Sequence, residues 1–63
     1  MYKVGDKIKY NTMPGEIARI EDIKDSTIKH IFFTLENVYN RPDWFFGLYD
    51  CYTDDTSLEA VFD

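Results

Sequence analysis

An aromatic run from Trp44 to Tyr52 places the strongest constraint on how this 63-residue chain can fold. The run holds five of the eleven aromatic side chains, the single tryptophan and the single cysteine. Apolar residues stand at both odd and even positions, so a strand here presents bulky groups to both faces of a sheet. One face can pack into a core, whereas the other face needs a separate role. We therefore predict a strand over 44–52 with a kink or a close backbone approach at Gly47.

The register of this strand stays open at the level of sequence. In one phase Trp44, Phe46 and Leu48 fill the core, while Phe45 and Tyr49 remain outside. In the opposite phase Trp44 and Phe46 are the exposed residues. A shift of one residue moves every side chain to the other face, so the pattern alone does not decide between the two.

The N-terminal third predicts a strand followed by a turn. Between Lys7 and Tyr10 the residues alternate, which places Ile8 and Tyr10 inward and the two lysines in water. The Pro14-Gly15 pair then fits the central positions of a type II turn.

Two further strands are predicted in the middle of the chain. The segment 16–23 has β character, and its apolar residues break strict alternation, so we expect a bulge or a sharp bend near Ala18-Arg19. A short helix also fits the three-residue spacing of those apolar positions. After a polar hairpin loop at 24–27, the segment 28–35 alternates again. Its predicted inward face consists of Ile31, Phe33 and Leu35, and its other face of His30, Phe32 and Thr34.

The C-terminal segment predicts a brief helix. Thr56 and Glu59 have the spacing of a capping box, which favours one turn of α- or 3₁₀-helix from Leu58 to Val61. The remaining elements are all short strands and turns, so the predicted class is all-β.

The first third of the chain resembles an SH3-like barrel of the Tudor-like and KOW-like type. The resemblance lies in Val4-Gly5-Asp6-Lys7-Ile8, which is similar to the entry strand of those domains, and in the segment from Gly15 to Ile20, which is similar to their second strand. It implies one small barrel of about five strands over residues 1–63, with a one-turn helix before the last strand. A compact acidic chain of this kind also resembles small phage or prophage accessory proteins.

Size and charge narrow the function classes. A chain of 63 residues buries only about 60% of the surface that its unfolded form exposes, which leaves little material for a deep catalytic cleft. The net charge of −5 is uneven, because residues 1–30 sum to +1 and residues 31–63 to −6. An acidic half disfavours general nucleic-acid binding, whose affinity comes mainly from Lys and Arg. One cysteine and no apolar leader indicate a cytoplasmic protein away from membranes.

Catalytic and metal-binding patterns are weak. His30 is a lone histidine in an alternating strand, and Cys51 has no basic neighbour in sequence to lower its pKa. Asp50, Asp54 and Asp55 form an acidic cluster, but the twelve-residue Ca²⁺ loop pattern is absent. We expect no enzyme activity, no cofactor and no metal, and we expect Asp54 and Asp55 to favour the N-terminus of the predicted helix.

A non-catalytic protein-interaction module, an adaptor or an inhibitor, is the function that the sequence favours. Trp and Tyr dominate interface hot spots, and aromatic-lined grooves bind proline-rich segments. An aromatic groove beside carboxylates suits a basic or proline-containing protein segment. The predicted partner-binding residues are Tyr39, Trp44, Phe45, Tyr49, Asp50, Tyr52, Asp54 and Asp55.

Other interpretations remain beside it. The rings can simply cover the ends of a small barrel or form a dimer seam, so the chain is expected to be a monomer or a weak dimer. Nucleic-acid or ribosome association through the Lys-rich first half is the alternative function. Mimicry of DNA phosphates by the carboxylates of residues 43–63 is a further one.

Overall fold

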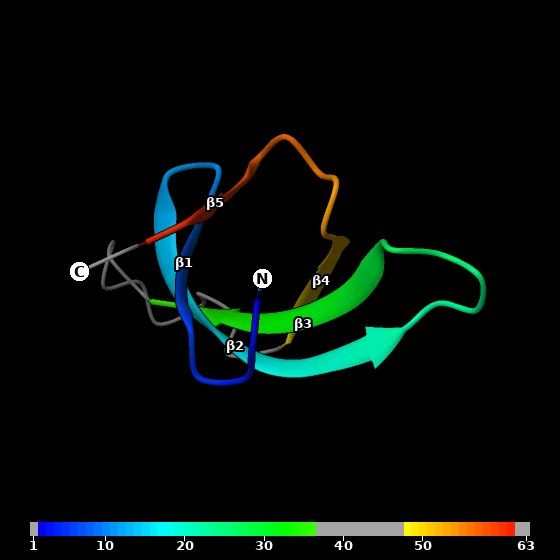
Figure 1. Ribbon diagram of the computed structural model, residues 1–63. Helices are drawn as coiled ribbons and strands as arrows, with labels where there is room; N and C mark the ends of the chain where they lie inside the picture. The colour runs from blue at the N-terminus through cyan, green and yellow to red at the C-terminus, as the bar shows by residue number, and fades with distance from the viewer. Residues whose placement is uncertain (1, 37–47, 62–63) are drawn as a thin grey trace.

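The protein is a small curled antiparallel β-sheet, a half-barrel, in a computed structural model that describes residues 2–36 and 48–61 (Figure 1). Its strands are β1 (Lys7–Tyr10), β2 (Met13–Asp22), β3 (Lys29–Leu35), β4 (Tyr49–Tyr52) and β5 (Leu58–Ala60). They form one sheet in the order β4-β3-β2-β1-β5. The predicted all-β class and strand number are confirmed, and the arrangement is compatible with an SH3-like barrel.

The curl of the sheet brings one buried side chain or more from every strand into a common core. The buried residues are Ile8, Ile17, Ile31, Phe33, Cys51 and Leu58. Tyrosines, isoleucine and leucine at the margin pack against them, namely Tyr2, Tyr10, Ile20, Leu35 and Tyr49. Rings at the margin thus enlarge the small core that a chain of this size can build.

The β1–β2 hairpin has the predicted strand but a different turn. Lys7 and Lys9 are exposed and Ile8 is buried, as the alternation predicts. The turn lies at Asn11 and Thr12, whose φ angles of 48° and 69° match the type I′ turn of a two-residue hairpin. The predicted type II turn at Pro14-Gly15 is therefore wrong, because both residues lie inside β2.

Gly15 is needed in β2 because a neighbouring strand approaches it closely. A Cβ atom at this position would lie 2.1 Å from the backbone oxygen of Thr34 in β3. Pro14 is tolerated because it is the second residue of the strand, where a missing N–H costs little. Its carbonyl oxygen accepts a hydrogen bond of 2.9 Å from the N–H of Glu36.

The predicted irregularity in the second strand is confirmed. The register of β2 against β3 shifts between Ile17 and Arg19, which makes Ala18 the bulged position. A bulge bends a strand and increases its twist. It lets the ten-residue β2 pair with both β1 and β3 around the curve of the half-barrel.

The third strand has the predicted faces, and the fourth settles the open phase for its described part. Ile31 and Phe33 are fully buried in β3. In β4, Cys51 is buried, whereas Leu48, just before the strand, is 56% exposed and Tyr52 is 50% exposed. The phase that would bury Leu48 and expose Tyr49 is therefore wrong. The part of the predicted strand at 44–47, including the kink at Gly47, lies outside the described residues.

The C-terminal helix is also a wrong prediction. Leu58 to Ala60 form β5, which pairs with β1, and the preceding residues 53–57 make turns. Leu58 enters the core and lies opposite Tyr10 of β1. Pairing with β1 stabilises this segment more than a single helical turn would, because one turn of helix is unstable without tertiary contacts. Within residues 2–36 and 48–61 there is no helix long and apolar enough to cross a membrane.

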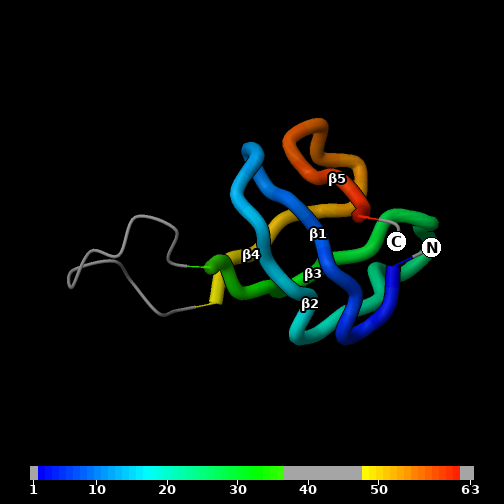
Figure 2. The backbone as a smooth tube through the Cα atoms, turned by 90° about the vertical axis from the view of Figure 1, so that its left-hand side faces the viewer, coloured from blue at the N-terminus to red at the C-terminus, as the bar shows by residue number. Residues whose placement is uncertain are grey.

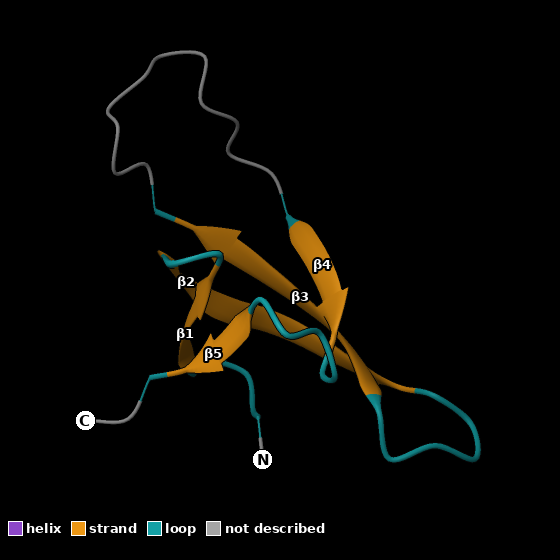
Figure 3. Cartoon of the chain, turned by 90° about the horizontal axis from the view of Figure 1, so that it is seen from above, coloured by secondary structure: helices purple, strands orange, loops and turns teal. Residues whose placement is uncertain are grey.

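The two ends of the sheet are β4 and β5. Figure 2 shows the curl of the backbone, and Figure 3 shows the segment 53–57 passing from β4 to β5. The strands β2 and β3 are the longest and form the middle of the curl. Their side chains therefore divide into a concave core face and an outer face that carries the candidate site.

Candidate interaction surface

Three rings follow one another on the outer face of β3 and β4, and we call Phe32, His30 and Tyr52 the ring row. The centroids of the His30 and Phe32 rings are 4.4 Å apart with a tilt of 40°. The His30 and Tyr52 rings are stacked at 4.8 Å. His30 and Tyr52 lie directly opposite each other in the β3–β4 register, which is the closest placement that two strands give to a pair of side chains.

Charged groups stand at both sides of the ring row. The guanidinium carbon of Arg19 lies 4.2 Å from the centroid of the Phe32 ring, within the range of a cation–π contact. Nε2 of His30 lies 2.8 Å from a carboxylate oxygen of Asp50. A guanidinium nitrogen of Arg19 also lies 3.8 Å from a carboxylate oxygen of Glu21. The side chains of Arg19, Glu21 and Asp50 are each more than half exposed, and the Tyr52 ring is half exposed beside them. The surface therefore offers one ring and two carboxylates to solvent, while His30 and Phe32 are partly buried.

The register explains why these side chains meet. Arg19, Phe32 and Asp50 lie side by side across β2, β3 and β4, and Glu21, His30 and Tyr52 form the next row. The bulge at Ala18 sets the pairing of Arg19 with Phe32, because the register changes there. The alternation within each strand thus decides which side chains face outward, and the bulge decides which outward side chains of β2 and β3 lie next to each other.

The structure brings only some of the predicted partner-binding residues together. Asp50 and Tyr52 belong to this surface. Tyr49 points toward the core, with its ring stacked on Phe33 at 6.1 Å. Asp54 and Asp55 lie in the turn after β4. Tyr39, Trp44 and Phe45 lie outside the described residues.

Sequence reasoning missed Phe32, His30 and Arg19 as members of a site. The alternation of 28–35 does place His30 and Phe32 on the face away from the core. What it lacks is the cross-strand register, which depends on a bulge and on a long connection between β3 and β4. The signal in the sequence that indicates this site is a histidine and a phenylalanine two residues apart, on the same outer face of one strand.

Asp55 has a structural role in the turn before β5. One carboxylate oxygen accepts a 2.9 Å hydrogen bond from the N–H of Ser57, and the other accepts one of 2.8 Å from the hydroxyl of Tyr10. These bonds to Ser57 and Tyr10 hold the pKa of Asp55 below its ordinary value of 3.8. Because no helix forms here, the predicted role of Asp54 and Asp55 at a helix N-terminus is wrong. Asp55 instead connects the turn to β1 through the hydroxyl of Tyr10.

Asp55 should make the stability of the fold sensitive to acid. Its pKa is lower in the folded than in the unfolded chain, so its contribution is present above pH 4 and is lost as pH falls through the folded pKa. In the parent protein the urea midpoint of unfolding should fall between pH 5 and pH 2.5, and we expect Asp55→Asn to make this fall smaller. Asp54→Asn removes the same charge from the same turn, and its urea midpoint should fall as far as that of the parent protein. Equal acid sensitivity of Asp55→Asn and the parent protein would contradict this role.

Cys51 is a core residue of β4. It is 6% exposed, and burial, with the nearby carboxylates Asp55 and Asp50 adding to it, raises the pKa of its thiol to about 11. The reactive form of cysteine is the thiolate, which is scarce at neutral pH when the pKa is so high. Cys51 is therefore a buried thiol that holds little thiolate at neutral pH.

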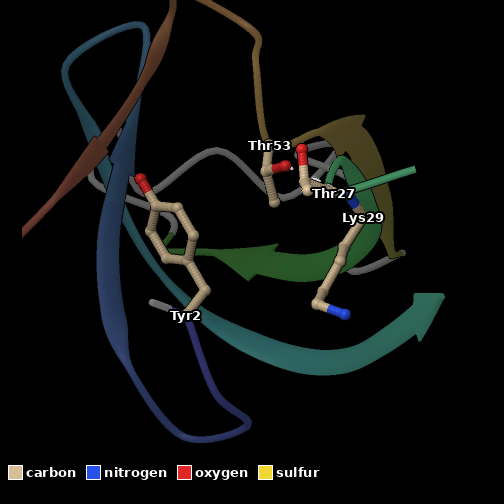
Figure 4. Close-up of a pocket in the computed structure, with 4 residues that line it drawn as sticks. All are labelled: Tyr2, Thr27, Lys29 and Thr53. Atoms are coloured by element: carbon tan, nitrogen blue, oxygen red, sulfur yellow. Dashed lines mark hydrogen bonds between the residues drawn. The ribbon is translucent and has the colours of Figure 1, made fainter. Parts of the chain in front are cut away.

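A hollow of about 240 Å³ opens between Tyr2, which lies before β1, and the end of the β2–β3 loop (Figure 4). It is lined by Tyr2, Thr27, Lys29 and Thr53. The hydroxyl of Thr53 accepts a 3.0 Å hydrogen bond from the N–H of Lys29, and the ammonium of Lys29 pairs with Asp22. The lining groups are thus largely engaged with the fold itself, and the hollow contains none of the predicted site residues.

The carboxylates of β4 and its following turn do not gather into a metal site. Asp50 is directed to His30, and Asp55 to Tyr10 and Ser57. Among residues 2–36 and 48–61 there is no group of three or more His, Cys, Asp or Glu side chains that could hold a metal ion.

Comparison of the chain with family models, with curated proteins and with solved structures finds no match in any of the three. The fold defines the class of the protein: residues 2–36 and 48–61 form a half-barrel of five antiparallel strands with an aromatic and acidic outer face.

Proposed function

We propose that this chain is a small SH3-like barrel that acts as a non-catalytic protein-interaction module, an adaptor or an inhibitor. Its binding surface is the ring row with Asp50 at its side, and its partner carries a basic or proline-containing segment. The observation that carries the proposal is the stack of His30 and Tyr52 at 4.8 Å on the outer face, with Tyr52 half exposed. Large rings that keep one apolar face in water are typical of interface hot spots.

The charges around the ring row favour a protein partner over a nucleic acid. Two cations of the first half are paired within the fold, since Lys7 binds Glu16 at 2.8 Å and Lys29 binds Asp22. A partly neutralised cation contributes less to the counterion release that supports nucleic-acid binding. Between residues 48 and 61 the chain has four acids and neither lysine nor arginine, which repels phosphate and attracts a basic segment.

The test compares two exposed apolar residues at different places on the surface. A partner is captured from a cell lysate with the parent protein and then titrated in pure form. Tyr52→Ala should weaken its binding by about 2 kcal/mol or more, which is about thirtyfold, because a hot-spot ring is lost. Val4→Ala removes an exposed side chain in the turn before β1 and should leave the affinity unchanged. Circular dichroism confirms that both variants are folded.

Two results would overturn the proposal. If Tyr52→Ala binds every purified partner as tightly as the parent protein, the ring row is not the binding surface. If an oligonucleotide is retained at low ionic strength and released by salt, the nucleic-acid alternative replaces it. Loss of a DNA-binding partner with Asp54→Lys, but not with Tyr52→Ala, would identify the carboxylates as a DNA mimic.

A further inference from the structure

The outer edge of β4 has a defined set of backbone groups that point away from the sheet. The strand is the last in the order β4-β3-β2-β1-β5 and pairs with β3 alone. Just beyond the strand, the N–H of Thr53 donates a 3.0 Å hydrogen bond to the oxygen of Lys29, the residue directly opposite it. In an antiparallel ladder, hydrogen-bonded pairs alternate with pairs that are not bonded. Thr53, Cys51 and Tyr49 therefore direct their backbone groups to β3.

The residues between them direct theirs outward. Asp50 presents both its N–H and its carbonyl oxygen at the edge, and Tyr52 presents its N–H. The carbonyl oxygen of Tyr52 accepts a 3.0 Å bond from the N–H of Asp55. Among residues 2–36 and 48–61 there is no strand on this side of β4. Such an edge is a template for an additional strand.

The side chains of the same two residues belong to the outer face. Asp50 ends the row that begins with Arg19 and Phe32, and Tyr52 ends the row that contains His30. An antiparallel strand added to β4 would continue both rows, with one residue opposite Asp50 and another opposite Tyr52. Because strand side chains alternate, these two residues of the added strand are two positions apart.

Charge selects the occupant of this edge. The stretch 48–61 carries Asp50, Asp54, Asp55 and Glu59 and has no basic residue. A second copy pairing through β4 would bring two such stretches together, which like charges oppose. A lysine or arginine opposite Asp50 would instead form a cross-strand ion pair, and an aromatic or branched residue opposite Tyr52 would extend the ring row.

We propose that a basic extended segment of a partner protein adds to β4 as a sixth, antiparallel strand. The segment carries a large apolar residue opposite Tyr52 and, two positions later, an arginine or lysine opposite Asp50. This inference rests on the proposed function, because it states how the interaction module holds its partner. Main-chain hydrogen bonds supply a sequence-independent part of the affinity, and the two outer-face side chains supply specificity.

The test uses a short synthetic peptide of threonine and valine that carries a tyrosine and, two positions later, an arginine. Binding to the parent protein should slow hydrogen exchange of the Asp50 and Tyr52 amides by about tenfold or more, as measured by NMR. Changing the arginine of the peptide to glutamate should weaken binding by about tenfold, and Asp50→Lys in the protein should reverse that preference.

Backbone methylation supplies a matched control. Methylating the amide nitrogen of the arginine, which faces β4, removes a donor from the shared ladder and should abolish binding. Methylating the next residue of the peptide, whose N–H faces away, should leave binding intact. Equal binding of the two methylated peptides, or unprotected Asp50 and Tyr52 amides at millimolar peptide, overturns the strand addition. Protection that rises with protein concentration and needs no peptide also overturns it, since the occupant is then a second copy.

Failure of the added strand can be distinguished from failure of the proposed function. A purified natural partner that depends on Tyr52 but leaves both amides exchanging freely would refute the added strand and retain the interaction module. If every purified partner binds Tyr52→Ala as tightly as the parent protein, the proposed function fails at its binding surface, the ring row.

Discussion

Replacing Gly15 by alanine is expected to destabilise the fold by about 3 kcal/mol or more, because a backbone oxygen occupies the space that a methyl group would need. The added Cβ would lie 2.1 Å from the oxygen of Thr34 and 3.0 Å from a methyl group of Leu35. A side chain can rotate away, whereas the oxygen of Thr34 belongs to the backbone of β3, which pairs with β2 at Glu16. Relief therefore requires β2 and β3 to separate at this point.

Such a loss is large for a domain of this size. At about 0.05–0.15 kcal/mol per residue, 63 residues give a total stability of about 3–9 kcal/mol. Gly15→Ala should accordingly be largely unfolded, or should unfold at a much lower urea concentration, when followed by circular dichroism.

Gly5→Ala is the matched control for this substitution. Gly5 has a φ of 92°, but a Cβ there would meet nothing within 4 Å. Only backbone strain is added, so we expect a loss of about 1–2 kcal/mol. If the two alanine variants unfold at the same denaturant concentration, the close approach of β3 to Gly15 is wrong.

Gly15 also illustrates where sequence reasoning about this fold succeeds and fails. Alternation in Lys7–Tyr10 and in 28–35 identifies strands and their buried faces, because burial on one side leaves a period of two. A Pro-Gly pair, by contrast, has two physical uses: a turn, or a strand start followed by a close approach. The choice depends on the position of Thr34, nineteen residues away, and no local pattern contains it.

The C-terminal segment fails for a similar reason. The Thr56–Glu59 spacing is a valid local signal for a helix, but one turn of helix is worth little without tertiary contacts. As a strand, Leu58 reaches the core and pairs opposite Tyr10. A non-local partner therefore decides the structure of three residues.

The candidate site shows the same limit at the level of single rings. The surplus of aromatic residues in the second half of the sequence predicts a binding role for Asp50 and Tyr52. The ring that stacks on Tyr52, however, comes from β3, where the alternation of residues places His30 and Phe32 on the outer face but does not identify their neighbours. Only the β3–β4 register turns one outward histidine and one outward tyrosine into a stacked pair.

Adjacent phenylalanines in β3 allow the assignment of its buried and outer faces to be tested directly. Phe33 is fully buried, with its ring centroid 5.2 Å from that of Tyr10 and 6.1 Å from that of Tyr49. Phe33→Ala should cost about 3–5 kcal/mol, since it removes a large ring and leaves a cavity between two strands. Because this cost is about as large as the total free energy of unfolding of the domain, the variant should lose its cooperative urea transition.

Phe32→Ala makes the same chemical change one residue earlier, on the opposite face. It removes the contacts of a partly buried ring with His30 and Arg19 and should cost only about 1 kcal/mol, the scale of one ring contact and one cation–π contact. A result in which Phe32→Ala unfolds the protein and Phe33→Ala does not would mean that β3 presents its faces the other way round, which would place the ring row in the core. With the expected result, Phe32→Ala becomes a folded protein whose ring row is shortened at the Arg19 end. Its affinity for the partner then reports on the outer face without a contribution from stability.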